Sequence, residues 1–258
     1  MSRSTSIARR ARQLALACLF AMLPAAFVAD AVAEEKTESF PAYERSENFV
    51  EQSLEGWTLR VHKDLREKDR ELGDRALEQA RSHLLQVKTR VPAKLLPRLQ
   101  AVTIWLNVRP GEPAVYHPSR GWLAEHGHNP DKAKCVEIPD ANTYLRYSRD
   151  QQSILLHELA HAYHDQVLGF DESRIRERFE TAKEAGLYDS VLRTSGKVER
   201  HYALSNEKEF FAEMTEAFLA ANDFYPFVRP ELRRHDPETY DLLVEIWEKG
   251  EDVEGKGD

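Results

Sequence analysis

The sequence predicts an α+β fold in which a small twisted sheet packs against a central helix and a mainly helical portion follows. The best strand candidate spans 101–108, a run rich in the β-branched and aromatic residues that fit a pleated surface. Residues 72–91 carry apolar side chains at the spacing of one helical face. From about residue 149 onward the periodic segments are helical. The predicted strands therefore gather in the first half of the chain.

The composition is that of a globular protein with a highly charged surface. The chain has 258 residues, of which 41% are hydrophobic and 31% charged, enough for a sizeable core in one or two domains. Its formal net charge of −8 argues against a nucleic-acid partner, because such a protein needs a basic face to displace counterions from phosphates. Two cysteines exclude a disulfide scaffold and a cysteine-rich zinc module.

The first 33 residues predict a secretory signal peptide. Arginines precede an apolar run from Leu14 to about Val28, and the Ala-Val-Ala of residues 31–33 offers a cleavage site. The run holds about 15 residues, fewer than the ~20 that a membrane-spanning helix needs. We expect a secreted or periplasmic protein with no stable membrane insertion after cleavage; the alternative is a retained anchor. Cleavage would leave Cys135 as a lone cysteine, which cannot form an internal disulfide.

The next part of the chain holds the predicted strands and one long helix. Residues 34–55 are polar and acidic, and we expect an irregular lead-in. Residues 57–61 alternate between apolar and polar, which favours a short strand. The helix over 72–91 ends at Pro92, because proline lacks the N–H of a helical hydrogen bond. The strand over 101–108 follows it.

Loops give way to helices in the rest of the chain. Residues 111–146 are dense in Gly, Pro, Asn and His, and predict loops with short strands near 114–116 and 135–138. Ser148 is a plausible N-cap for the central helix, and Gly169 marks its end. The predicted helices span 149–168, 171–186, 206–221 and 236–250.

The central helix carries a motif that predicts a metal site, His157-Glu158-Leu159-Ala160-His161. Residues four apart lie on one helical face, so both imidazoles can bind one metal ion. Glu158 is rotated away from the pair but lies close enough to reach a water on that metal. This arrangement is the H-E-x-x-H zinc motif.

A catalytic zinc needs a third protein ligand and an open fourth position. The helix over 206–221 offers Glu209, Glu213 and Glu216 on one face, whereas Glu207 lies roughly opposite. Burying a carboxylate beside phenylalanines is costly unless it is paired or binds a metal. Glu209 and Glu213 are the two serious candidates. One would bind zinc, and the other would orient a histidine ligand.

The motif together with Tyr202, Glu209 and Glu213 resembles the zinc-peptidase domain of the anthrax lethal factor group of gluzincins. The resemblance covers about 150–220. It implies a zincin-like fold, Glu209 as the third ligand, Glu213 as a carboxylate behind the ligands, and Tyr202 as a group that stabilises the transition state. Residues 100–232 also resemble a group of uncharacterised bacterial secreted zinc peptidases, which supplies no substrate.

Other histidines have less specific expectations. His164 lies one turn past His161 on the same side, and we expect it to support a carboxylate or to pack in the structure; the alternative is that it binds substrate. His117, His126 and His128 lie in the loop-rich segment, where we expect solvent-exposed side chains; the alternatives are that they line the cleft or bind a second metal.

We therefore expect a secreted zinc metalloendopeptidase that binds one Zn²⁺ per chain and cleaves a peptide or protein substrate. Zinc on His157, His161 and Glu209 lowers the pKa of its bound water to about 7. Glu158 takes the proton from that water, and Tyr202 donates to the oxyanion. The alternatives are a catalytically silent zinc module that binds a partner, or a zinc hydrolase of cell-wall cross-links. The expected organisation is a signal peptide (1–33), a lead-in and helix (34–100), a zincin-like peptidase domain (101–250) and a charged tail (251–258).

Overall fold

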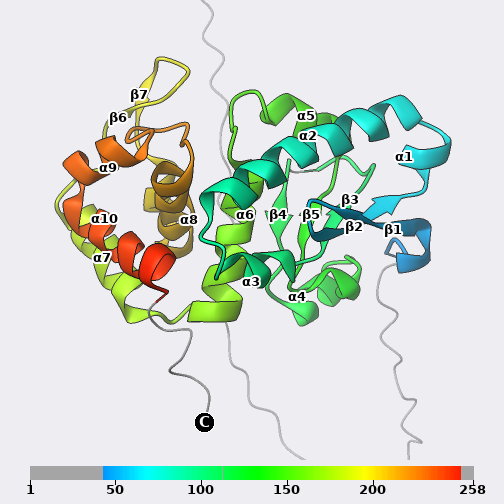
Figure 1. Ribbon diagram of the computed structural model, residues 1–258, viewed down its shortest axis with the longest axis horizontal. Helices are drawn as coiled ribbons and strands as arrows, with labels where there is room; N and C mark the ends of the chain where they lie inside the picture. The colour runs from blue at the N-terminus through cyan, green and yellow to red at the C-terminus, as the bar shows by residue number, and fades with distance from the viewer. Residues whose placement is uncertain (1–42, 112, 251–258) are drawn as a thin grey trace, which may run out of the picture. The chain divides into compact units, whose positions relative to one another are not determined.

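A mixed five-stranded sheet in the order β1-β2-β3-β5-β4 lies at the centre of one half of the fold. The computed structural model describes residues 43–111 and 113–250 (Figure 1). The sheet contains β1 (Phe49–Leu54), β2 (Trp57–His62), β3 (Ile104–Leu106), β5 (Val136–Ile138) and β4 (Val115–Tyr116). The three middle strands run parallel, and each edge strand runs antiparallel to its neighbour. The α+β class is thus confirmed.

The first hairpin corrects the prediction of an irregular lead-in over 34–55. Strands β1 and β2 are joined at Glu55 and Gly56, both with positive φ, which is the conformation of the tight turns that suit hairpin twist. Strand β2 then pairs with β3, so residues on both sides of residue 100 share one sheet. We expected the compact domain to begin at 101; instead, all the described residues belong to one compact unit.

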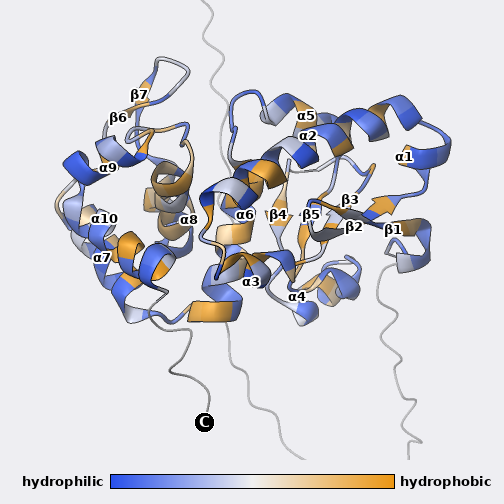
Figure 2. Cartoon of the chain, in the orientation of Figure 1, coloured by the Kyte–Doolittle hydropathy of each residue, from blue (hydrophilic) through white to orange (hydrophobic). Residues whose placement is uncertain are grey.

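One face of the sheet packs against two helices to form the core. Helix α2 (Arg70–Arg90) buries its predicted apolar stripe there, and α6 (Ile154–Tyr163) lies beside it. Register aligns Leu59 with Ile104, and Ile104 with Val136, so apolar side chains form a continuous row. Figure 2 shows hydrophobic residues on α6 and on the neighbouring strands, whereas α1 (Asp64–Glu67) is hydrophilic. Burial of this row is the main stabilising contribution in this half.

The opposite face of the sheet is polar at its centre. Trp105 and Glu137 are neighbours on β3 and β5, and the loop over 117–135 covers them. Lys132 is buried there between the Trp105 ring and the Glu137 carboxylate, and His117 Nε2 lies 2.9 Å from Glu137 Oε2. This cluster of His117, Lys132 and Glu137, which we call the sheet cluster, fastens the loop to the sheet.

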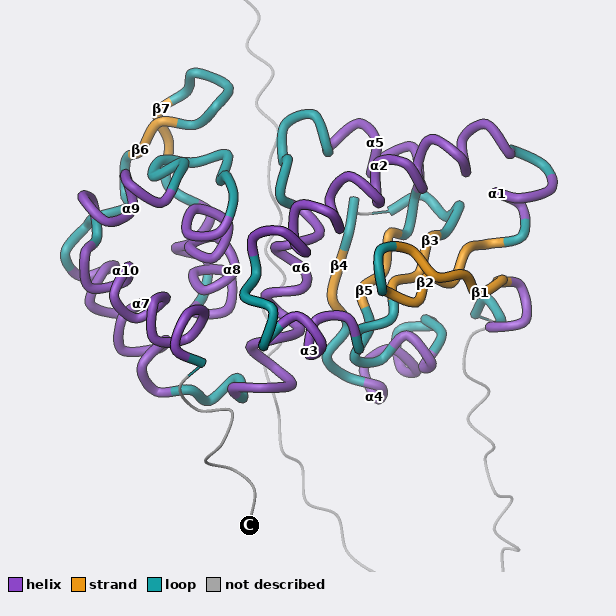
Figure 3. Tube along the Cα trace, in the orientation of Figure 1, coloured by secondary structure: helices purple, strands orange, loops and turns teal. Residues whose placement is uncertain are grey.

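The second half of the fold is mainly helical, and α6 separates it from the sheet (Figures 1 and 3). It contains α7 (Ser173–Glu184), α8 (Glu207–Leu219), α9 (Arg229–His235), α10 (Pro237–Leu243) and a hairpin of β6 (Val191–Leu192) and β7 (Val198–Glu199). The remaining helices of the first half are α3 (Leu96–Gln100), α4 (Arg120–Glu125) and α5 (Ala141–Tyr147).

The central helix is shorter than predicted. Ser148 does not cap it; its hydroxyl donates to Tyr144 O at the end of α5, and α6 begins only at Ile154. The helix then continues as a π-helical turn over His164–Leu168. The predicted signal peptide (1–33) and charged tail (251–258) lie outside the described residues. Among residues 43–111 and 113–250, no helix is long and apolar enough to cross a membrane.

Candidate metal centre

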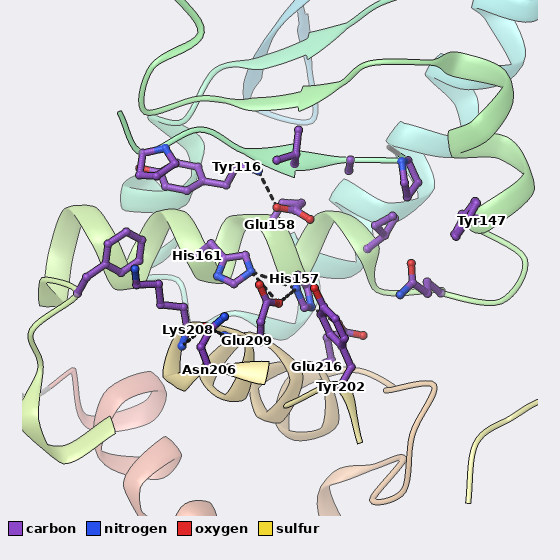
Figure 4. Close-up of a pocket in the computed structure, with 17 residues that line it drawn as sticks. Tyr116, Tyr147, His157, Glu158, His161, Tyr202, Asn206, Lys208, Glu209 and Glu216 are labelled. Carbon is purple, nitrogen blue, oxygen red and sulfur yellow. Dashed lines mark hydrogen bonds and ion pairs between the residues drawn. The ribbon is translucent and has the colours of Figure 1, made fainter. Parts of the chain in front are cut away.

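Helices α6 and α8 lie side by side and carry the predicted metal ligands and Glu158, whereas Tyr202 begins the 3-10 turn that precedes α8 (Figure 4). Ser153, just before α6, donates to Ala221 O at 2.6 Å, so the start of α6 meets the end of α8. Asn206 caps α8, because its side chain accepts hydrogen bonds from the backbone of Lys208 and Glu209. This cap holds Glu209 in the first turn of α8, facing the histidines of α6.

Three atoms that could bind a metal ion, which we call the converging donors, lie close together where the helices meet. The distance between His157 Nε2 and His161 Nε2 is 3.1 Å, and Glu209 Oε2 lies 3.1 Å and 3.4 Å from these two nitrogens. A tetrahedral zinc ion with bonds of about 2.0–2.1 Å separates its ligand atoms by roughly 3.3 Å. The donor set of two imidazoles and one carboxylate, and its spacing, therefore fit a zinc ion.

Glu216 holds His157 in the orientation that such a site needs. Its Oε1 lies 2.6 Å from His157 Nδ1, whereas Glu213 Oε1 lies 3.5 Å from the same nitrogen. A proton on Nδ1 that is donated to Glu216 leaves the lone pair of Nε2 free for a metal. We predicted Glu213 as the supporting carboxylate; Glu216 is the closer group. The signal was present, because Glu216 lies two turns after Glu209 on the same face.

Burial and neighbouring charges shift the pKa values of the histidine and carboxylate groups in this site. Burial disfavours a charged His157, but hydrogen bonds to Glu209 and Glu216 outweigh it and raise the pKa of His157 well above its usual value. Burial likewise opposes a charged Glu209, yet both histidines lower its pKa. Glu213 is different: burial and the neighbouring Glu216 raise its pKa, and Asn222 donates to its Oε2 at 2.8 Å.

Glu158 is held next to the converging donors by the edge of the sheet. Its Oε2 accepts a hydrogen bond of 2.7 Å from the backbone N–H of Tyr116 in β4, as Figure 4 shows. The carboxylate is mostly buried, with 8% of the residue exposed. No side-chain motif could have indicated this contact, because the donor is a backbone group on a strand placed by the fold.

The donors and Glu158 line one cavity of about 430 Å³. Strand β4 borders it, and residues 113–116 contribute to its lining. Tyr202 lies on the His157 side, with about half of its surface exposed, whereas Lys208 lies on the His161 side (Figure 4). The structure thus brings Tyr202, Glu158 and the three donors to the same cavity.

His164 does not contact the converging donors through a hydrogen bond. Its buried ring packs edge-on against Phe170 and Phe211, and neither ring nitrogen has a hydrogen-bond partner among the described residues. Burial lowers its pKa to about 4, so it is neutral at pH 7. The expected support of a carboxylate is therefore wrong, and the packing role remains. His117 is also buried rather than solvated, as part of the sheet cluster.

Comparison of the chain with protein-family models, curated proteins and solved structures finds no match.

Proposed function

We propose that the chain is a secreted zinc-dependent metallopeptidase with a zincin-like fold, as the resemblance to gluzincins implies. One observation carries the proposal: two imidazoles and a carboxylate converge at the spacing of a tetrahedral zinc site, beside a fourth side chain that can move a proton. A purely structural zinc would need four protein ligands and no such neighbour. In this chain His157, His161 and Glu209 would hold the ion.

A bound zinc ion supplies a Lewis acid that lowers the pKa of water to about 7 and polarises a carbonyl. Glu158 accepts the proton of the attacking water and later delivers it to the leaving amine. Its Oε2 is anchored by Tyr116 N–H, so the carboxylate keeps a fixed position in the cavity. The Tyr202 hydroxyl donates to the carbonyl oxygen as negative charge develops on it.

The substrate peptide has a natural place along β4. This strand is an edge of the sheet, paired only with β5 among the described strands, and it borders the cavity. An extended peptide can add to such an edge through main-chain hydrogen bonds, which suits a protease that accepts many sequences. Figure 4 places the edge directly above Glu158 and the donors.

The decisive experiment compares the chain with its Glu158→Gln variant, both loaded with zinc and shown to bind one ion. Each is incubated with a diverse peptide mixture, and cleavage is measured by mass spectrometry. We expect the variant to lose about 10²–10⁴-fold in rate, the usual contribution of a general base. Glu207→Gln is the matched control, because Glu207 starts α8 and does not line the cavity. Zinc binding without any cleavage by the unaltered chain would contradict the proposal.

Tyr202→Phe tests the second role. We expect a fall of about 10²–10³-fold in kcat with unchanged zinc content, since the hydroxyl would act only on the developing charge. An unchanged kcat would remove Tyr202 from the mechanism and leave Glu158 in place.

A further inference from the structure

The two ends of the cavity differ in chemistry. On the His157 side Tyr202 and Tyr147 present aromatic rings and hydroxyls, whereas Lys208 presents a cation on the His161 side (Figure 4). Lys208 is the one lysine or arginine among the described residues that line the cavity. The proposed chemistry does not use it, so its presence in the wall needs another explanation.

Lys208 is held in place without an acidic partner. Its backbone N–H donates to the Asn206 cap at 2.9 Å, and its Nζ lies 4.4 Å from the centre of the Phe170 ring. A cation over an aromatic face is attracted by the ring quadrupole. Within residues 43–111 and 113–250, no carboxylate lies within ion-pair distance of this ammonium.

The carboxylates of the cavity already have other partners. Glu209 lies against His157 and His161, Glu216 against His157, and Glu158 against the Tyr116 N–H. Lys208 is half-buried as a residue, and its ammonium is therefore a positive charge in the cavity wall without a carboxylate partner among the described residues. A charge-assisted hydrogen bond to such a group is stronger than one between neutral groups.

We infer that Lys208, stacked on Phe170, binds a carboxylate of the substrate on the His161 side of the scissile bond and so selects acidic peptides. The inference rests on the proposed peptidase function and names its substrate class. The Phe170 ring offers an apolar surface for the methylenes of a Glu side chain, while the ammonium meets its carboxylate. The net charge of −8 gives acidic peptides no long-range attraction, so the selection arises from this local contact.

Two sources supply the same chemistry: an acidic side chain within a peptide, or the carboxylate at a peptide's C-terminus. Peptides with an internal Glu and an amidated end test the first source. Peptides without acidic residues and with a free or amidated end test the second. Cleavage of the first set alone indicates selection of a side chain, and dependence on the free end indicates selection of the terminus.

The test measures kcat/KM for peptide pairs that differ only as Glu against Gln, or as free acid against amide. We expect the unaltered chain to favour the carboxylate by about 10–100-fold, the range of a hydrogen bond to a charged group. Lys208→Gln should reduce this ratio to about 1, Lys208→Arg should retain most of it, and Lys208→Glu should favour a Lys peptide instead. These reciprocal changes would not follow from a structural role.

A binding measurement accompanies the kinetics. Fluorescence anisotropy of the same labelled peptides on the zinc-loaded Glu158→Gln variant should give a Kd ratio of about 10–100-fold in favour of the carboxylate. Adding Lys208→Gln to this variant should reduce the ratio to about 1. Lys183→Gln is the matched control, because Lys183 also lies over a phenylalanine ring, that of Phe179 on α7, away from the cavity.

Two outcomes overturn the inference separately from the function. If peptides are cut without any carboxylate preference, or if the preference survives in Lys208→Gln, Lys208 is not the selecting group. If no peptide is cut by the unaltered chain or bound by Glu158→Gln, the proposed peptidase function fails, and the inference fails with it.

Discussion

Two clusters of histidine and carboxylate in this protein have opposite organisations. In the sheet cluster, Glu137 accepts from His117 and from Lys132, and each of the three side chains is less than a tenth exposed. Burial would raise the pKa of Glu137, but His117 and Lys132 lower it to about 2. The second cluster lies between helices α6 and α8, and we call it the α6–α8 site. There Nε2 of His157, Nε2 of His161 and Oε2 of Glu209 converge at the wall of the cavity.

This contrast distinguishes a structural cluster from a binding site made of the same residue types. In the sheet cluster a lysine balances the carboxylate, so positive and negative charges satisfy one another inside the protein. In the α6–α8 site two carboxylates and two imidazoles gather with no lysine or arginine among the converging groups. A metal cation would balance these carboxylates, which agrees with the zinc site that we propose.

The largest expected effect is the loss of the metal from the α6–α8 site in Glu209→Ala. Loss of a residue that supports a ligand lowers metal affinity by up to about 100-fold. Loss of one of the three ligands themselves should lower zinc affinity by more than this. Zinc titration against a chromophoric chelator measures the change. Glu207→Ala, at a position of α8 that does not line the cavity, should retain full affinity. Equal zinc binding by both variants would contradict the assignment of Glu209.

The sheet cluster should respond in stability instead. Glu137→Gln leaves the Lys132 ammonium buried and unpaired, and we expect a loss of about 3–5 kcal/mol in the free energy of unfolding. Urea denaturation measures it. Replacing both partners, with Glu137→Leu and Lys132→Met, should recover much of the loss because no buried charge remains in the pair. A stable Glu137→Gln single variant would show that Lys132 finds another partner.

The next effect distinguishes Glu216 from Glu213. Glu216→Gln should lower zinc affinity by about 10–100-fold, because Glu216 orients His157 through Nδ1. Glu213→Gln should cost less, since its oxygen lies 3.5 Å from that nitrogen and it already interacts with Asn222. The ratio of the two zinc dissociation constants is the measurement. A greater loss in Glu213→Gln would make Glu213, rather than Glu216, the carboxylate that orients His157.

The smallest effect concerns a third kind of histidine, one paired only with neutral groups. His83 lies 2.8 Å from the Tyr144 hydroxyl and 2.9 Å from Gln79 Nε2, and burial lowers its pKa from 6.5 to about 4. Between these pH values the unfolded chain binds a proton that the folded chain does not, so stability is lost as the pH falls. From pH 7 to 5.5 this group should cost about 1 kcal/mol.

Urea denaturation of the unaltered chain and of His83→Gln across this pH range measures the contribution. The loss in the free energy of unfolding between pH 7 and 5.5 should be about 1 kcal/mol smaller in the variant. His164 and His201 also have lowered pKa values and contribute with the same sign, but they are present in both proteins and cancel. If the free energy of unfolding changes equally with pH in the two proteins, His83 does not contribute to the pH dependence of stability.

The sequence predicted the local elements better than their limits. Helices α2 and α8 and strands β2, β4 and β5 lie where periodicity and composition placed them, because each buries a face that the sequence marks with apolar residues. Strand β1 was missed, since its alternation is weak and its order comes from pairing with β2. Helix α5 was missed, because it lies at the end of a segment that predicts loops. Ser148 follows α5 rather than capping α6, since a serine can end one helix as readily as it begins another.

Helical spacing alone implies that His157 and His161 share one helical face and that three glutamates share another, because this spacing is a local property of the chain. Which glutamate meets which nitrogen depends on the fold. The packing of α8 on α6 places Glu209 at both Nε2 atoms and Glu216 at Nδ1. The fold also places β4 against Glu158, and it places Lys208 in the cavity wall. Such contacts between distant segments depend on packing rather than on spacing along the chain.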